Sequence, residues 1–323
     1  MQMDDDRPDT SGMYELEFPG PQLLAEDGSG PVLIHALEGF TDAGHATKLA
    51  AGHLKAALDS ELVASFAIDE LLDYRSRRPA MTFKTDRFTD YAEPELSLYA
   101  LRDSLGTPFL LLTGLEPDLK WERFVAAVRL LSERLGVRRT VGLGSIPMAV
   151  PHTRPVTLTA HSNNKDLIAD ITPWVGEVRV PGSAAGLLEY RMAQHGHEVL
   201  GYTAHVPHYL SQSDYPQAAV SLLEQVCKSC GLALPMTELL ERATAVNASI
   251  AEQVVESEEV AAVVAALEQQ YDAFIAAQEN RSLLARDDDL PSGDELGAEF
   301  ERFLAQQTGE SFGDDPADGA GAS

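Results

Sequence analysis

The sequence is poor in cations and cysteines, and it has no long apolar run. It carries 24 Lys and Arg against 51 Asp and Glu in 323 residues, a formal charge of −27. This balance argues against nucleic acid as a partner, because affinity for a phosphate backbone comes mainly from clustered cations. It also argues against anionic membrane surfaces. Two cysteines cannot form a disulfide scaffold.

No stretch approaches the roughly 18 apolar residues of a membrane-spanning helix. The first 20 residues include Asp4, Asp5 and Asp6 and lack the basic start and apolar stretch of a signal peptide. We therefore expect a cytoplasmic protein that binds no membrane. Hydrophobic residues make up 44% of the chain, enough for a sizeable core without cross-links.

The acidic charge is concentrated at the two ends of the chain. Residues 286–323 contain eleven acidic residues against two Arg, a charge of −9, and residues 1–11 contain four against one Arg, a charge of −3. Because these ends account for −12 of the net charge of −27, we interpret the acidity as a solubility feature and not as a binding code. We expect residues 1–14 and 307–323 to be disordered tails.

Apolar runs alternate with helical patterns over residues 15–234, which predicts an α/β domain with crossover connections and a mainly parallel sheet. Residues 73–101 break this rhythm and suggest an antiparallel excursion. Strands are expected at residues 32–37, 62–68, 109–113, 140–143, 156–160, 175–180 and 197–205, and helices at 46–54, 121–135, 184–194 and 216–228.

A helical region is expected over residues 235–306. Two helices, at 235–256 and 257–277, precede a third that opens with a capping box of Ser292 and Glu295. The second helix carries an apolar stripe, which needs the α/β domain or a second copy to cover it. That stripe contains Val260, Val263, Val264, Leu267, Tyr271, Phe274 and Ile275.

Two loops with carboxylates follow predicted strands. In residues 39–44, Thr41 or Asp42 is placed to cap the next helix, and we favour this interpretation over a ligand loop at the strand end. Glu116, in the loop after residues 109–113, has the same two interpretations: an acid or base facing a ligand, or part of a turn set by Pro117. We favour the turn.

The best candidate site lies between residues 142 and 155. The small residues Gly144 and Ser145 end a strand, and His152 and Arg154 follow in a proline-rich loop. Backbone N–H groups and an Arg both donate hydrogen bonds to oxyanions, so this segment is a candidate anion site. The alternative is a loop whose polar side chains satisfy local carbonyls. No lysine follows the glycines as in a Walker phosphate loop.

Ser183, His205 and His208 also lie at the ends of predicted strands. Ser183 is a candidate nucleophile with His152, His205 or His208 as base, but its surroundings lack the glycines of a nucleophile elbow, so we favour a helix cap. A parallel sheet would gather these residues at one edge.

No set of ligands has the spacing of a zinc site, and no cofactor is expected. Cys227 and Cys230 have redox spacing but end a helix, which favours a structural role.

Read together, these loops resemble the family named for proteasome assembly chaperone 2, in its bacterial branch. The resemblance covers most of residues 30–305. The segments that carry it are residues 38–44 (EGFTDAG), 114–117 (GLEP) with Trp121, 146–147 (IP), 150–155 (VPHTRP), 180–183 (VPGS), 205–210 (HVPHYL), 255–260 (VESEEV) and 267–272 (LEQQYD).

The resemblance implies a three-layer α/β/α sandwich with a mixed, mainly parallel sheet, similar to phosphorylase/hydrolase-like folds. It also implies helices that make homo-oligomers, trimers in bacterial members, and no established enzyme activity. Eukaryotic members chaperone the assembly of proteasome α-subunits. Some archaeal relatives dock on the proteasome through a C-terminal hydrophobic–tyrosine–any motif, from which this chain departs because it ends in DGAGAS.

Two functions from different classes remain open. The first is a non-catalytic oligomeric binding protein or assembly chaperone, with proteasome subunits as a candidate partner. The second is a small-molecule hydrolase or phosphorylase-like enzyme, in which His152 is the acid or base, Arg154 holds an anionic group and Asp42 orients a polar one.

Overall fold

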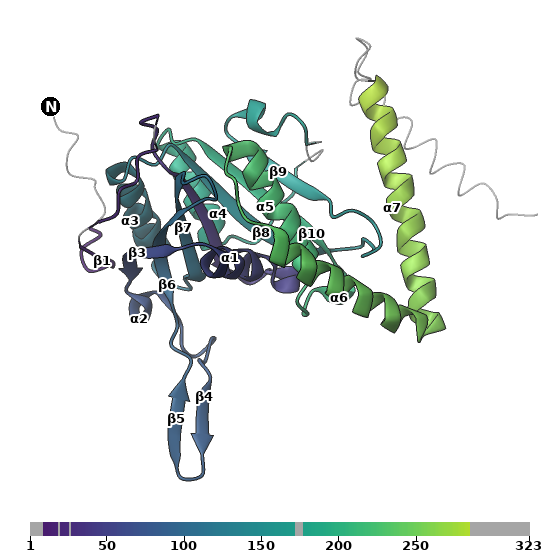
Figure 1. The fold of residues 1–323 in the computed structure, drawn as a ribbon, viewed down its shortest axis with the longest axis horizontal. Helices are drawn as coiled ribbons and strands as arrows, with labels where there is room; N and C mark the ends of the chain where they lie inside the picture. The colour runs from purple at the N-terminus through teal and green to yellow at the C-terminus, as the bar shows by residue number, and fades with distance from the viewer. Residues whose placement is uncertain (1–8, 19, 26, 172–176, 285–323) are drawn as a thin grey trace, which may run out of the picture. The chain divides into compact units, whose positions relative to one another are not determined.

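The fold is built on a mixed sheet covered by helices on both faces (Figure 1). It was analysed in a computed structural model that describes residues 9–18, 20–25, 27–171 and 177–284. Within these residues the sheet has eight strands in the order β1-β3-β6-β7-β2-β8-β10-β9. In chain order they are β1 (Tyr14–Leu16), β2 (Val32–Glu38), β3 (Ser60–Phe66), β6 (Leu96–Arg102), β7 (Pro108–Leu115), β8 (Arg139–Met148), β9 (Leu158–Ser162) and β10 (Val199–Pro207).

The centre of the sheet is parallel and its edges are antiparallel. Strands β7, β2, β8 and β10 run parallel to one another, whereas β1, β3 and β6 on one side and β9 on the other pair antiparallel. Strands β2 and β7, at the centre, are largely apolar because helices bury them on both faces, as is usual for parallel strands. The predicted α/β/α sandwich with a mixed sheet is confirmed.

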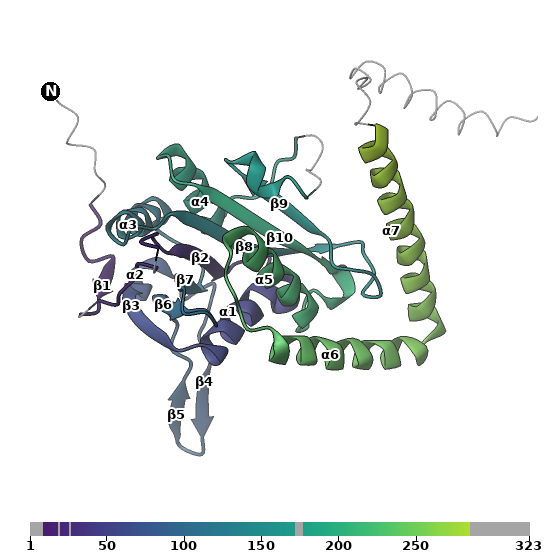
Figure 2. The ribbon, with the colours of Figure 1, turned by 45° about the horizontal axis from the view of Figure 1, so that its top comes forward.

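Two apolar cores lie on the two faces of the sheet. On one face, α1 (Ala46–Ala57) and α5 (Pro216–Cys230) cover side chains such as Ile34 and Leu111. On the other face, α3 (Trp121–Arg134) and α4 (Ala184–Gln194) cover Leu33 and Leu110. Figure 2 shows these layers from a second side. Short helical turns complete the connections: η1 (Ala43–His45), α2 (Ile68–Leu71), η2 (Lys165–Ile168) and η3 (His208–Leu210).

The predicted antiparallel excursion is confirmed. Strands β4 (Met81–Lys84) and β5 (Arg87–Tyr91) form a separate two-stranded hairpin, and the chain then returns to the large sheet as β6. The hairpin projects away from the sheet in both views (Figures 1 and 2).

Two expectations are corrected. The strand expected at residues 175–180 is wrong, because the described part of it, residues 177–180, is not a strand. Its valines, Val178 and Val180, are exposed, and the strand that pairs with the edge of β10 is β9. The folded part also begins before residue 15, since Met13 is fully buried and Tyr14 opens β1.

The helical region begins with α6 (Thr237–Val255) and α7 (Glu258–Leu284), near the expected limits. Buried Leu239 and Ala243 attach α6 to the core that α1 and α5 form. The chain divides into two compact units, residues 1–268 and 269–323, so α7 crosses the boundary. The expected third helix with its capping box and the expected tail at 307–323 lie outside the described residues.

Candidate functional site

Loops after β2, β7, β8 and β10 leave the sheet at the carboxyl ends of its parallel strands, where open α/β sheets bind ligands. An open depression of about 420 Å³ lies beside the first of these loops. We call it the strand-end depression. It is lined by Glu38, Gly39, Phe40, Asp42, His45, Lys48, Arg77, Leu115, Ser211 and Gln212.

Charged groups of both signs line the strand-end depression, and protein groups already pair with several of them. Lys48 Nζ lies 3.1 Å from Glu38 Oε2. The guanidinium of Arg77 donates to the carbonyl oxygen of Glu116 at 3.0 Å and lies 3.1 Å from Asp118 Oδ1. Among the described lining residues no hydroxyl is hydrogen-bonded to a histidine, the arrangement that activates a serine nucleophile.

Asp42 holds the start of α1. Its Oδ1 accepts a hydrogen bond from the backbone N–H of Thr47 at 2.8 Å, and its Oδ2 accepts one from Lys48 N–H at 3.2 Å. Ser145 Oγ, from β8, donates to Oδ1 at 3.1 Å. The predicted capping role is confirmed. The turn also requires Gly44, whose φ is +64° and where a Cβ would lie 2.8 Å from the Cβ of Tyr215.

Ser183 and Glu116 together hold the start of α4. Ser183 Oγ accepts a hydrogen bond from Gly186 N–H at 2.9 Å, which confirms the predicted helix cap. The buried carboxylate of Glu116 accepts from Ala185 N–H at 3.0 Å. Gly39 leaves room for it, since a Cβ there would lie 2.8 Å from Glu116 Oε2. This carboxylate therefore stabilises a helix N-terminus.

His152 is buried against the loop after β10. Its backbone N–H donates to Tyr209 Oη at 2.9 Å, and its Nδ1 lies 2.7 Å from the same oxygen. Burial lowers the pKa of His152, which keeps the ring neutral near pH 7. His208 is exposed, and its ring packs edge-on to Tyr209 at 5.5 Å.

Arg154 meets a carboxylate of the chain itself. Its Nη1 lies 3.2 Å from Glu268 Oε1, in α7, and the neighbouring Thr153 hydroxyl donates to the same oxygen. The guanidinium that the sequence offered to an anionic ligand is thus engaged by a protein anion. Neither Arg154 nor His152 lines the strand-end depression.

His205 lies on the face of the sheet that α3 and α4 cover, between Thr157, which precedes β9, and Thr159 of β9. Thr157 Oγ1 is 2.8 Å from His205 Nδ1, and Thr159 Oγ1 is 2.9 Å from Nε2. Burial lowers the pKa of His205. Gly144 occupies the next strand on this face, beside Thr203.

The eight predicted site residues thus fall into separate groups: Asp42 with Ser145, His152 with His208, and Arg154, Ser183, His205 and Gly144 each with other partners.

The sequence analysis missed a carboxylate held between two histidines. His35, Gly142, Gly201 and His161 stand opposite one another in one row across β2, β8, β10 and β9. Glu189, from α4, lies over the two glycines. Its Oε1 is 3.2 Å from His35 Nε2, and its Oε2 accepts from His161 Nε2. We call this set the Glu189 cluster.

The electrostatics of the Glu189 cluster follow from this geometry. Burial works against ionisation of Glu189, but the hydrogen bond from His161 and the nearby ring of His35 outweigh it and lower the pKa of the carboxyl to about 2. The hydrogen bond between His161 and Glu189 raises the pKa of His161. His35 is 1% exposed, and in the described part of the chain neither of its ring nitrogens makes a hydrogen bond of good geometry, although Nε2 lies within ion-pair distance of Glu189. The signal in the sequence that could have indicated this cluster is the presence of Gly142 and Gly201 inside strands, because a glycine there often marks a place where another group lies close to the backbone.

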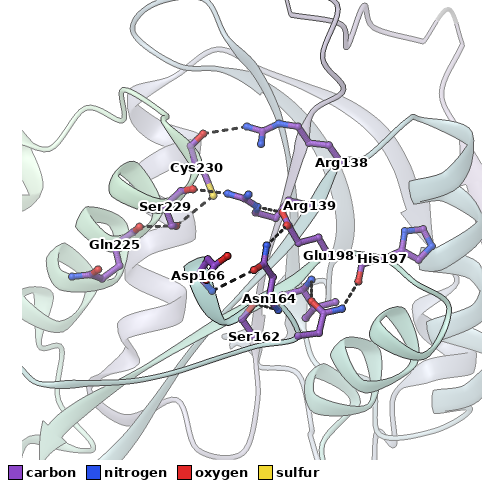
Figure 3. Close-up of polar contacts among 12 residues, drawn as sticks. Arg138, Arg139, Ser162, Asn164, Asp166, His197, Glu198, Gln225, Ser229 and Cys230 are labelled. Atoms are coloured by element: carbon purple, nitrogen blue, oxygen red, sulfur yellow. Dashed lines mark hydrogen bonds and ion pairs between the residues drawn. The ribbon is translucent and has the colours of Figure 1, made fainter. Parts of the chain in front are cut away.

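A further polar network lies at the opposite edge of the sheet, where β8 and β10 begin (Figure 3). Arg138 and Arg139 donate to the carbonyl oxygens of Cys230 and Ser229 at the end of α5, at 3.1 and 2.5 Å. Arg139 also pairs with Glu198 at 2.5 Å. Because these groups satisfy one another, we interpret the network as structural. Cys227 and Cys230, beside it, are not joined in a disulfide, and burial raises the pKa of Cys227.

Metal and membrane interpretations gain no support. Within the described residues, no three His, Cys, Asp or Glu side chains are grouped so as to hold a metal ion. Of the helices in the described ranges, none is long and apolar enough to cross a bilayer.

The fold has close relatives among solved structures. A Mycobacterium tuberculosis protein of unknown function is 70% identical, with a TM-score of 0.83, and the match covers 94% of this chain and 99% of that one. A Corynebacterium glutamicum protein of unknown function is 46% identical, with a TM-score of 0.78 and coverage of 81% and 98%. A proteasome-assembly chaperone homologue of M. tuberculosis is 26% identical, with a TM-score of 0.66 and coverage of 72% and 99%.

No curated protein matches the chain. The model of the PAC2 family matches residues 36–254, which include the strand-end loops, the large sheet from β3 onward and nearly all of α6. This is the family that the loop motifs of the sequence resembled. The chain therefore belongs to the PAC2 family.

Proposed function

We propose that this protein is a non-catalytic, oligomeric binding protein that acts in protein assembly, with proteasome subunits as its partner class. The observation that carries the proposal is the likeness, at 26% identity, to a proteasome-assembly chaperone homologue over 72% of this chain. A proteasome partner implies the cytoplasm as the place of action. We also propose a homo-oligomer, with the trimer that the family resemblance implies.

The polar groups at the strand ends support a binding protein over an enzyme. A general acid or base must reach the substrate, with a pKa suited to proton transfer. Here Asp42 holds α1, Glu116 holds α4 and Arg154 pairs with Glu268. The hydrolase or phosphorylase-like hypothesis needs Asp42, His152 and Arg154 around one ligand, and the strand-end depression includes only Asp42.

Exposed apolar side chains form a surface that a partner protein would cover. Val255, the last residue of α6, is 85% exposed, and Val260 and Val263 are exposed on the first turns of α7. Contact surfaces of proteins are apolar at the centre and polar at the rim. The glutamates around these valines fit that description.

The test mixes the purified full chain with proteasome α-subunits of the same organism and follows complexes by native mass spectrometry. We expect a defined complex and faster assembly of α-subunit rings. Because a charge of −27 attracts basic proteins without specificity, the mixture is also measured at about 0.5 M salt, which screens exposed charges. Absence of a complex at both salt concentrations contradicts the proteasome part of the proposal.

A further inference from the structure

Strand β9 lies at an edge of the sheet, and two histidine contacts tie it to its surroundings. It is the last strand in the sheet order and pairs only with β10 (Figure 1). His161, on β9, donates a hydrogen bond to Glu189 of α4. His205, on β10, lies between the hydroxyls of Thr157 and Thr159, which are 2.8 and 2.9 Å from its two ring nitrogens.

The contact between His161 and Glu189 requires a proton on the histidine. The side chain of Glu189 is 13% exposed, whereas that of His161 is 54% exposed and can exchange protons with water. The other titratable group that faces the carboxylate is His35 of β2, which is buried. When His161 loses its proton, Glu189 stays ionised, because its pKa is about 2. A buried carboxylate that has lost its cation is strongly unfavourable, so α4 and β9 are then driven apart.

The contact of His205 requires a neutral ring. A neutral imidazole has one N–H donor and one acceptor nitrogen, so one threonine accepts a hydrogen bond from the ring and the other donates one to it. Among the described residues no charged side chain faces this ring, which stands opposite Ile146 of β8 and between the two threonines. A second proton therefore creates a half-buried cation without a counter-charge, and the donating hydroxyl must turn away.

The two contacts are lost in opposite directions of pH. Glu189 raises the pKa of His161 above 6.5, so the contribution of its contact is complete below that pH and is lost as the pH rises through the folded pKa. Burial lowers the pKa of His205 below 6.5, so the contribution of its contact is complete above that pH and is lost as the pH falls through the folded pKa. Both contacts are complete together only near pH 6.5.

We propose that β9 is a pH-sensitive edge strand, which is attached to the sheet near neutral pH and is released from β10 at both acid and alkaline pH. The release is local, because β9 has one neighbouring strand whereas a central strand such as β2 has two. It includes the loop before β9, in which Thr153 and Arg154 meet Glu268 of α7. The protonation state of two histidines thus controls how the start of α7 is attached. The proposal concerns the chain alone and does not depend on the proposed function.

Hydrogen–deuterium exchange of the full chain, followed by mass spectrometry, measures the release. The exchange is recorded from about pH 4 to about pH 9 and is corrected for the intrinsic pH dependence of amide exchange. We expect the protection of residues 157–163 to be greatest near pH 6.5 and to fall by about tenfold or more towards both ends of the range. Residues 32–38, which form the central strand β2, are expected to keep their protection throughout.

Two variants separate the two limbs of this profile. Glu189→Gln removes the buried anion and is expected to abolish only the alkaline fall in protection. His205→Gln keeps one donor and one acceptor between the threonines and is expected to abolish only the acid fall. The matched control is His195→Gln, which replaces an exposed histidine at the end of α4 and is expected to keep both falls.

Three results overturn the proposal. The first is protection of residues 157–163 that stays constant over the whole range in the wild type. The second is an equal loss of protection in residues 32–38, because the chain then unfolds as a whole. The third is a profile with both falls in Glu189→Gln and His205→Gln. A variant that is merely less stable loses protection in β2 as well, so the comparison of β9 with β2 in one sample distinguishes this case.

Discussion

The substitution Gly142→Ala tests whether Glu189 lies over the centre of the sheet. A Cβ at residue 142 would lie 1.9 Å from Glu189 Oε1 and 2.7 Å from His35 Nε2. No backbone strain opposes alanine there, because the φ of Gly142 is not in the left-handed region. The methyl group must therefore displace the carboxylate of Glu189 from its place beside His35.

The expected cost combines two effects. Forcing a methyl group into a packed region costs about 1–3 kcal/mol. Leaving the buried ring of His35 without Glu189 costs roughly another 1–3 kcal/mol. Since alanine also restricts the unfolded chain, which offsets a fraction of this, we expect a net loss of about 2–4 kcal/mol in the free energy of unfolding.

Urea titration measures the loss as a lower midpoint with an unchanged slope. The matched control is Gly144→Ala, two residues along β8 on the same face, where a Cβ meets Thr203 Oγ1 at an ordinary 3.5 Å. We expect that variant to lie within about 0.5 kcal/mol of wild type. Equal stability of the two variants would refute the position of Glu189. A second check is the double variant with Gly142→Ala and Glu189→Ala. Its loss of unfolding free energy should be smaller than the sum of the losses of the two single variants.

Three more outcomes follow from buried polar groups. The folded pKa of Glu189, about 2, is below its ordinary 4.5, so its contribution to stability is complete above about pH 4.5 and is lost as the pH falls towards 2. The pKa of His161 is raised above 6.5, so its contribution is complete below that pH and is lost as the pH rises through the folded value. Urea midpoints from about pH 3 to 9 should show both limbs, and Glu189→Gln should flatten them. Asp103→Ala leaves three backbone N–H groups without their acceptor and should cost about 2–4 kcal/mol, measured by thermal unfolding. Asp42→Ala removes the cap of α1 and should cost about 1 kcal/mol in the same assay, with Asp42→Asn retaining most of the stability.

The fold was predictable because the burial of strands and helix faces produces a regular pattern of apolar residues in the sequence. Residues 32–37 and 109–113 are apolar except for His35 and Thr113, and they became the neighbouring central strands β2 and β7. The excursion at 73–101 was visible for the converse reason, since its alternation of aromatic and polar residues belongs to an exposed hairpin. The strand expected at 175–180 failed because two exposed valines beside prolines resemble a buried strand in composition alone.

The contacts of the site were not predictable, because they join residues far apart in the chain. Nothing near Arg154 in the sequence indicates that its partner is Glu268. Glu189 lies on a helix with few buried residues and reaches His35 only because Gly142 and Gly201 leave space in the sheet. The local roles were predictable: Ser183 and Asp42 act within a few residues of their own position, as helix caps do.

The polar groups that have hydrogen-bond partners and the apolar side chains that stay exposed indicate whether this protein is suited to bind a small substrate or another protein. The carboxylates at the strand ends have donors within the fold, and His152 has the hydroxyl of Tyr209. Large apolar side chains stay exposed on the β4–β5 hairpin and at the end of α6 and start of α7. Burying such surface gains free energy in proportion to its area and needs no particular atom opposite, whereas binding a small substrate needs directed polar groups. The exposed aromatic rings and valines therefore favour the protein-binding function proposed above over the binding of a small substrate.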